Sequence, residues 1–94
     1  MIDNILGTDL NIEWPITIDN EESSLEELDI SVYVQCNRFK KKMSLNVENN
    51  TISFTFLGIE QRVYGIYDLE LVLKEGKEGQ VVVREKNVFR LIND

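Results

Sequence analysis

Apolar and polar residues alternate with a period of two along most of this chain, and no other feature constrains its fold as strongly. The longest uninterrupted run covers residues 28–37. Successive side chains of a β-strand point to opposite faces of the sheet, so such alternation is typical of a strand with one buried face. We therefore predict a strand here, with five residues pointing inward: Leu28, Ile30, Val32, Val34 and Cys36.

Two further alternating runs, residues 52–56 and 67–73, are joined by a linker that contains Gly58 and Gly65. The linker is too long for a tight hairpin, so we expect it to carry the chain from one sheet to another. Tyr67 opens the second run, which is the position of a tyrosine corner, a motif in which the hydroxyl group binds a nearby backbone group. These two strands are the predicted centre of the fold.

Residues 9–18 form another alternating run, and Trp14 lies on its apolar side, so we predict Trp14 in the core. Pro15 has no N–H to donate to a neighbouring strand. The strand is therefore predicted to lie at a sheet edge or to break near Pro15. Residues 1–8 show no clear pattern.

Two turns are predicted in the remaining sequence. The polar, glycine-containing segment 75–79 predicts a hairpin loop, and residues 81–83 and 88–92 are expected to form the last two strands. Asn49 and Asn50 predict a two-residue turn, because asparagine tolerates the positive φ angles that such turns need. With that turn, the expected opposing pairs are Val47 with Ile52, Leu45 with Phe54, and Met43 with Phe56.

These elements predict one domain, residues 1–94, with an all-β fold. The expected architecture is an antiparallel immunoglobulin-like β-sandwich of about seven strands. A chain of 94 residues with 43% hydrophobic residues can bury one core. A deep cleft would have to be taken out of that core, so a shallow surface or a sheet edge is the expected functional element.

Residue types that usually carry catalysis or bind metals are scarce in this chain. It contains no histidine and only one cysteine, Cys36, which we predict to be a buried, unreactive thiol. The carboxylate pairs Asp9 with Glu13, and Asp68 with Glu70, fall on predicted outward, solvated faces. We therefore predict no catalytic, cofactor-binding or metal-binding residues, no cofactor and no enzymatic activity.

The segment 19–29 carries six acidic residues and no basic residue. It lacks the spacing of a calcium-binding loop, so a solvated acidic loop is predicted. Ser24 and Glu27 have the spacing of a capping box, which allows a single helical turn.

The formal net charge of −7 repels nucleic-acid phosphates and anionic lipid surfaces. Four cations, Arg38, Lys40, Lys41 and Lys42, cluster in five residues, and we interpret them as a solvated connection whose lysines discourage strand pairing. The first ten residues lack the basic and apolar regions of a signal peptide, and no run of 18 apolar residues occurs. We expect neither nucleic-acid binding nor membrane insertion, and the localisation stays open.

An alternative function follows from the aromatic residues. Sugar-binding sandwiches present aromatic rings on an open face, and Tyr33 and Tyr64 are the rings that the alternation leaves outside. An extracellular carbohydrate- or surface-binding module is therefore the second hypothesis, and it requires Tyr33, Tyr64 or Trp14 to line up on one open face.

Several motifs together resemble a known family. They are G-T-D-L followed by the tryptophan strand (residues 7–14), N-x-I-x-F-x-F (residues 50–56), Q-x-x-x-G-x-Y-x-L (residues 61–69) and F-R-L (residues 89–91). This arrangement resembles the immunoglobulin-like β-sandwich domains of phage and prophage structural proteins, such as those near the N-termini of baseplate upper proteins and fibres. The resemblance implies a non-enzymatic assembly module that docks to itself or to a neighbouring virion subunit, in a virion or in the host cytoplasm.

Overall fold

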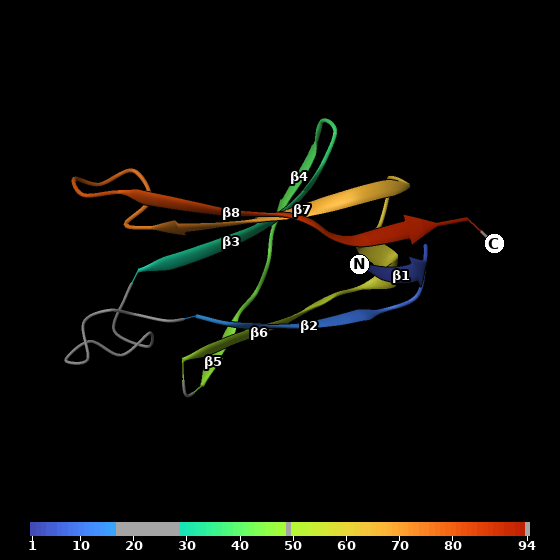
Figure 1. Ribbon diagram of the computed structural model, residues 1–94, viewed down its shortest axis with the longest axis horizontal. Coiled ribbons are helices and arrows are strands. Elements are labelled where there is room, and N and C mark those ends of the chain that lie inside the picture. Colours follow the sequence, from blue (N-terminus) through green and yellow to red (C-terminus); the bar gives the residue numbers. More distant parts are fainter. Residues whose placement is uncertain (17–28, 49, 94) are drawn as a thin grey trace.

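The computed structural model describes residues 1–16, 29–48 and 50–93, and these residues form two β-sheets that face each other (Figure 1). The predicted acidic loop, with Ser24 and Glu27, lies outside the described residues apart from Asp29, and so does Leu28. The larger sheet contains, in spatial order, β1 (Ile2–Ile5), β8 (Val81–Ile92), β7 (Gly65–Leu73), β3 (Ile30–Cys36) and β4 (Phe39–Lys42). The smaller sheet contains β2 (Leu10–Pro15), β6 (Thr51–Phe56) and β5 (Asn46–Glu48).

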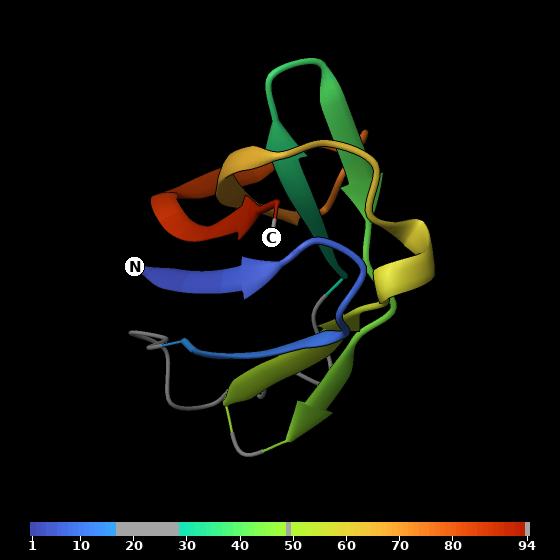
Figure 2. The same ribbon diagram turned by 90° about the vertical axis from the view of Figure 1, so that its right-hand side faces the viewer.

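This arrangement confirms the predicted all-β sandwich, with eight strands where about seven were expected. The order β8-β7-β3 in one sheet and β2-β6-β5 in the other is the order of strands G-F-C and B-E-D in the immunoglobulin sandwich. One pairing departs from a purely antiparallel fold. β1 runs parallel to β8, with Ile2 opposite Phe89 and Ile5 opposite Ile92. Figure 2 shows β1 and β8 on one side of the larger sheet and β4 on the other.

The core lies between the two sheets and contains a cluster of aromatic rings. The rings of Tyr67 and Phe89 stack with their centroids 4.8 Å apart, and Phe56 meets Tyr67 edge to face at 5.7 Å. Trp14, predicted in the core, is partly buried and packs against its margin. The buried cluster consists of Leu10, Ile12, Val32, Val34, Cys36, Met43, Ile52, Phe54, Phe56, Tyr67, Leu69, Leu71, Phe89 and Leu91.

The linker between β6 and β7 crosses from the smaller sheet to the larger one, as predicted. A single 3₁₀ turn, η2 (Gly58–Glu60), begins the crossing. The Tyr67 hydroxyl donates a hydrogen bond of 2.7 Å to the carbonyl oxygen of Val63, so the predicted tyrosine corner is present. Burial of the ring raises the pKa of Tyr67 to about 12, which keeps this hydroxyl protonated and able to donate.

Strand β2 ends at Pro15 and lies at the edge of the smaller sheet, as the proline predicts. Asn49 of the predicted turn lies outside the described residues, but the register between β5 and β6 includes the predicted pairing of Val47 with Ile52. The rest of that prediction was wrong, because β5 pairs with β6 over only three residue pairs. Met43 instead donates its backbone N–H to the carbonyl oxygen of Val32, so this part of the chain leaves the larger sheet to reach the smaller one.

The end of the chain forms one long strand, β8, where two strands were predicted. The polar residues between the two apolar segments suggested a turn, but they form an irregularity within the strand. The register between β7 and β8 shifts between Tyr67 and Leu69, and Asn87 adopts a positive φ of 56°. The backbone N–H of Asn87 donates to the Asp68 carboxylate at 2.9 Å, so a side chain satisfies the group that the ladder leaves free.

Candidate interaction surface

Within the described residues, the edge of β8 is open along most of its length. β1 pairs with β8 only from Phe89 to Ile92, and no described residue pairs with residues 81–88 on that side. Because β8 is antiparallel to β7, every second residue of β8 turns its N–H and C=O away from β7. These eight residues span about 26 Å at the usual rise of a strand. The open segment is therefore long enough to receive another strand.

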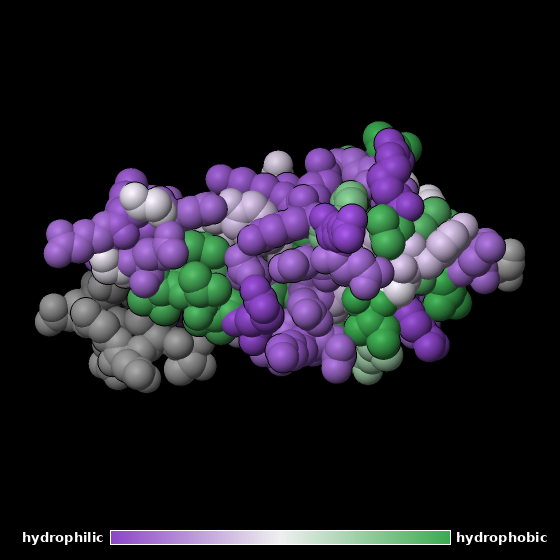
Figure 3. Space-filling model, turned by 90° about the horizontal axis from the view of Figure 1, so that it is seen from above, coloured by the Kyte–Doolittle hydropathy of each residue, from purple (hydrophilic) through white to green (hydrophobic). Residues whose placement is uncertain are grey.

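Three consecutive valines occupy the start of this edge. Val81, Val82 and Val83 are 49%, 50% and 44% exposed. Val82 lies opposite Val72 on the outer side of the sheet. The side chains of Val81 and Val83 point to the other side, to which the core-facing residues of β7 also point. In Figure 3, hydrophobic surface interrupts the polar outer face toward the end of the molecule that holds the β7–β8 turn. We name residues 81–88 the open edge.

The opposite edge of the same sheet carries lysines. Three of the four clustered cations, Lys40, Lys41 and Lys42, belong to strand β4, so they do not form the solvated connection that we predicted, whereas Arg38 lies in the turn before the strand. Because β4 is an outermost strand, its lysines lie where charged side chains would discourage pairing with other chains, and this effect stays a prediction. Lys41 forms an ion pair of 2.9 Å with Glu60, and Lys40 forms one of 2.9 Å with Glu70. Lysines therefore mark one edge of the larger sheet, whereas the other edge begins with three valines.

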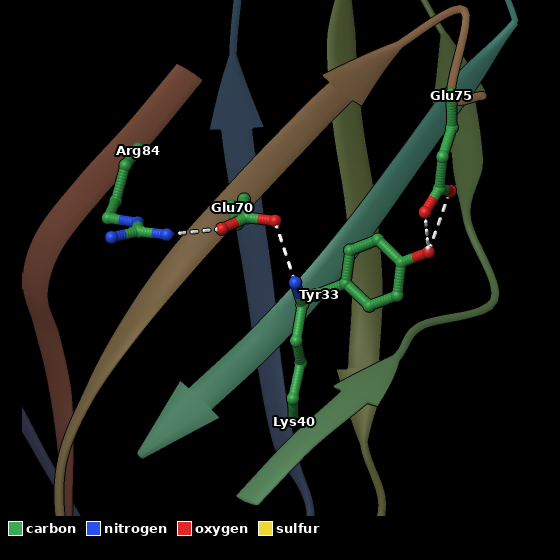
Figure 4. Close-up of polar contacts among 5 residues, drawn as sticks. All are labelled: Tyr33, Lys40, Glu70, Glu75 and Arg84. Carbon is green, nitrogen blue, oxygen red and sulfur yellow. Dashed lines mark hydrogen bonds and ion pairs between the residues drawn. The ribbon is translucent and has the colours of Figure 1, made fainter. Parts of the chain in front are cut away.

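A charged network ties β8 to the rest of the larger sheet (Figure 4). Glu70 on β7 receives hydrogen bonds from Arg84 on β8 at 2.6 Å and from Lys40 on β4 at 2.9 Å. Glu70 was predicted to be solvated, but its side chain is only 8% exposed because these longer side chains cover it. The hydrogen bond from Arg84, followed by that from Lys40, lowers the pKa of Glu70 below its ordinary value. Arg84 is thereby held within the open edge, on the outer side of the sheet.

This network predicts a pH-dependent contribution to stability. The folded-state pKa of Glu70 is depressed, so its contribution is fully present above about pH 4.5 and is lost as the pH falls through the folded-state value. We expect Glu70→Gln to reduce the free energy of unfolding by roughly 1 kcal/mol at pH 7 and to differ less from the wild type at pH 3. Urea unfolding at both pH values measures this. Asp3→Asn, which removes the exposed ion pair with Arg90, is the control, and an equal effect of both variants would contradict the prediction.

The aromatic residues predicted to lie outside occupy separate positions. The Tyr33 hydroxyl donates to the two carboxylate oxygens of Glu75 at 2.6 and 2.7 Å, and the Lys40 ammonium lies 4.7 Å from the centre of the Tyr33 ring (Figure 4). Tyr64 is half exposed in the loop before β7, and Trp14 faces the core from β2. The three rings therefore form no common platform of the kind that the carbohydrate-binding hypothesis requires.

The remaining surface offers shallow hollows. One of about 640 Å³ lies over the smaller sheet, and a neighbouring one has about 270 Å³. The larger hollow is lined by both polar and apolar residues, whereas the smaller one is lined by polar residues. In the described part of the chain, no group of three or more potential metal-binding side chains occurs, and no helix is long and apolar enough to span a membrane. The residues of the larger hollow are Asn11, Ile12, Glu13, Ser44, Leu45, Asn46, Ser53, Phe54, Thr55 and Leu57.

The single cysteine is placed as predicted. Cys36 is buried and not in a disulfide, and burial raises the pKa of its thiol. A protonated, buried thiol is a poor nucleophile, so Cys36 is suited to packing.

Comparisons with known proteins add no further assignment. Neither a scan of family models nor searches of curated proteins and of solved structures finds a match to this chain.

Proposed function

We propose that this chain is a non-enzymatic assembly module that binds another protein by accepting a strand at its open edge. The single observation that carries this proposal is the contrast between the two edges of the larger sheet. Three exposed valines begin one edge, whereas three lysines cover the other. Exposed edge strands are templates for pairing with another chain, above all where their residues are apolar, as at the three valines, and strand addition is a common mode of protein recognition.

The biological setting that we propose is a phage or prophage particle, in its baseplate, tail or fibre. The support for this setting is the resemblance of the sequence motifs to immunoglobulin-like domains of virion proteins. The non-enzymatic part of the proposal is supported by the residue types of the chain, which include no histidine and a single, buried cysteine. Within this setting, the partner is a second copy of the chain or a neighbouring subunit.

A binding experiment with matched variants tests the proposal. The candidate partner is the protein encoded by the adjacent gene, and calorimetry measures its affinity for the wild-type chain. We expect Val82→Lys to weaken binding by tenfold or more, because it places a charge among the three valines, the uncharged start of the open edge. Ile66→Lys is the matched control, since Ile66 is 46% exposed on the outer side of β7 and lies outside that edge.

The control is expected to change the affinity by less than threefold. Equal binding by the wild type and the Val82→Lys variant would contradict docking at the open edge. Thermal unfolding of both variants shows whether either substitution acts by unfolding the chain instead.

A further inference from the structure

We infer that the open edge pairs with the open edge of a second copy of this chain, antiparallel and about a two-fold axis at Val82 or Val83. This inference rests on the proposed function, because it names the partner of the same surface. Antiparallel pairing of two β8 strands would join the two larger sheets into one continuous sheet. An interface in which the same surface occurs on both copies is the usual one in symmetric dimers.

The alternation of side chains restricts the registers that such a dimer can adopt. A two-fold axis perpendicular to the sheet keeps the two outer faces on the same side. Residues that oppose each other across an antiparallel pair point to the same face. The two residues of each opposed pair must therefore both have even numbers or both have odd numbers. This condition holds only if the axis passes midway between the two copies of one residue, so that this residue opposes itself. The open edge offers only a few such positions.

Charge selects among these positions. An axis at Arg84 would oppose the two copies of Arg84, and an axis at Glu85 would oppose the two copies of Glu85 and bring Arg84 opposite Lys86. Opposed like charges destabilise a strand pair. No like charges meet if the axis lies at Val82, where Val81 opposes Val83, or at Val83, where Val81 opposes Glu85. The axis at Val82 brings all three exposed valines of the two copies together, which removes apolar surface from water. The axis at Val83 brings only the two copies of Val83 together and sets Val82 opposite Arg84.

The overall charge of the chain predicts how the dimer responds to salt. Each copy carries a formal net charge of −7, so the two copies repel each other at low ionic strength. The contact itself is apolar and is strengthened by salt, because added ions screen the repulsion between the copies. We expect the dissociation constant to fall severalfold between about 0.02 and 0.5 M salt, with a Debye length that decreases from about 20 Å to about 4 Å. A contact made by ion pairs would weaken over the same range.

Disulfide trapping locates the axis. Directly opposed residues in an antiparallel pair have Cα atoms about 4.5–5.5 Å apart, within the range that a disulfide spans. We expect one of the variants Val82→Cys and Val83→Cys to form a covalent dimer under mild oxidation. Glu85→Cys is the control in the same strand, because in either register its two copies lie four or more residues apart along the sheet. The native thiol of Cys36 is buried and does not compete.

Analytical ultracentrifugation of the full chain over a wide range of concentrations completes the test. A concentration-dependent dimer that the Val82→Lys variant loses, together with trapping at position 82 or 83 alone, supports the inference. A strict monomer, or trapping at Glu85→Cys equal to that at the valines, overturns it. If the wild-type chain is a monomer and Val82→Lys still loses binding to the protein encoded by the adjacent gene, the second copy is refuted as the partner. The open edge then remains the proposed binding surface. If the dimer persists in Val82→Lys, the open edge is not its interface and this inference fails alone.

Discussion

Replacing Gly58 with alanine is expected to lower the free energy of unfolding by about 3 kcal/mol or more, at the upper end of what overpacking usually costs. A Cβ atom at this position would lie 2.0 Å from the carbonyl oxygen and 2.4 Å from the carbonyl carbon of Gly7. Both atoms belong to the backbone, so no side chain can rotate away to relieve the clash. The N–H of Gly58 also donates to the Asp9 carboxylate at 2.7 Å, and moving η2 aside would break that bond.

Chemical denaturation at neutral pH measures this effect. Ile59→Ala is the matched control in the same 3₁₀ turn, since its side chain is 79% exposed and its loss should change stability by less than about 0.5 kcal/mol. A Gly58→Ala variant as stable as this control would show that the segment around Gly7 is not fixed against η2.

Replacing Gln61 with alanine is expected to cost roughly 2–4 kcal/mol, because it leaves the buried carbonyl group of Phe56 and two partly buried backbone groups, at Gly7 and Thr8, without partners. Gln61 is only 3% exposed. Its side-chain oxygen accepts from the N–H of Gly7 at 2.8 Å, and its amide nitrogen donates to the carbonyl oxygens of Thr8 at 2.8 Å and Phe56 at 3.1 Å. One side chain therefore joins the turn between β1 and β2 to the end of β6.

The same unfolding measurement tests this prediction, with Gln80→Ala as the control. Gln80 also has a side-chain oxygen that accepts a backbone hydrogen bond, from Gly76, but it does so on an exposed turn, where water can replace the lost partner. We expect the control to cost less than about 1 kcal/mol. Similar losses in the two variants would mean that the backbone groups around Gln61 find other partners.

The strands with regular alternation could be predicted from the sequence because alternation is a local property. Strand β3 and the crossing that ends at Gly65 follow directly from the period of two and from the length of the linker. The tyrosine corner at Tyr67 could also be predicted, since it depends on one residue at the start of a strand.

Other elements depend on distant parts of the chain and left no local pattern. β1 has no alternation that predicts a strand, and it exists because it pairs with the last residues of β8. β8 was predicted as two strands because the carboxylate of Asp68, which supports the irregularity at Asn87, lies on another strand.

The candidate site was hidden from the sequence for a similar reason. Whether the edge at Val82 is open depends on where β1 begins along β8, which no local pattern reports. Alternation also placed Glu70 on the outer face correctly but gave no information about Arg84 and Lys40, which cover it. The sequence contains the three consecutive valines, but its odd and even positions are both apolar there. The alternation therefore could not show which of the valines point outward.

The parallel pairing of β1 with β8 determines how this domain would carry a mechanical load. Ile2 lies at the start of β1 and Ile92 at the end of β8, and the two strands run in the same direction. Tension applied to Met1 and Asn93 would therefore make the strands slide past each other in shear, so that the hydrogen bonds between them share the force. Peeling, in which such bonds break one after another, would require the force to act on the strands from the same end.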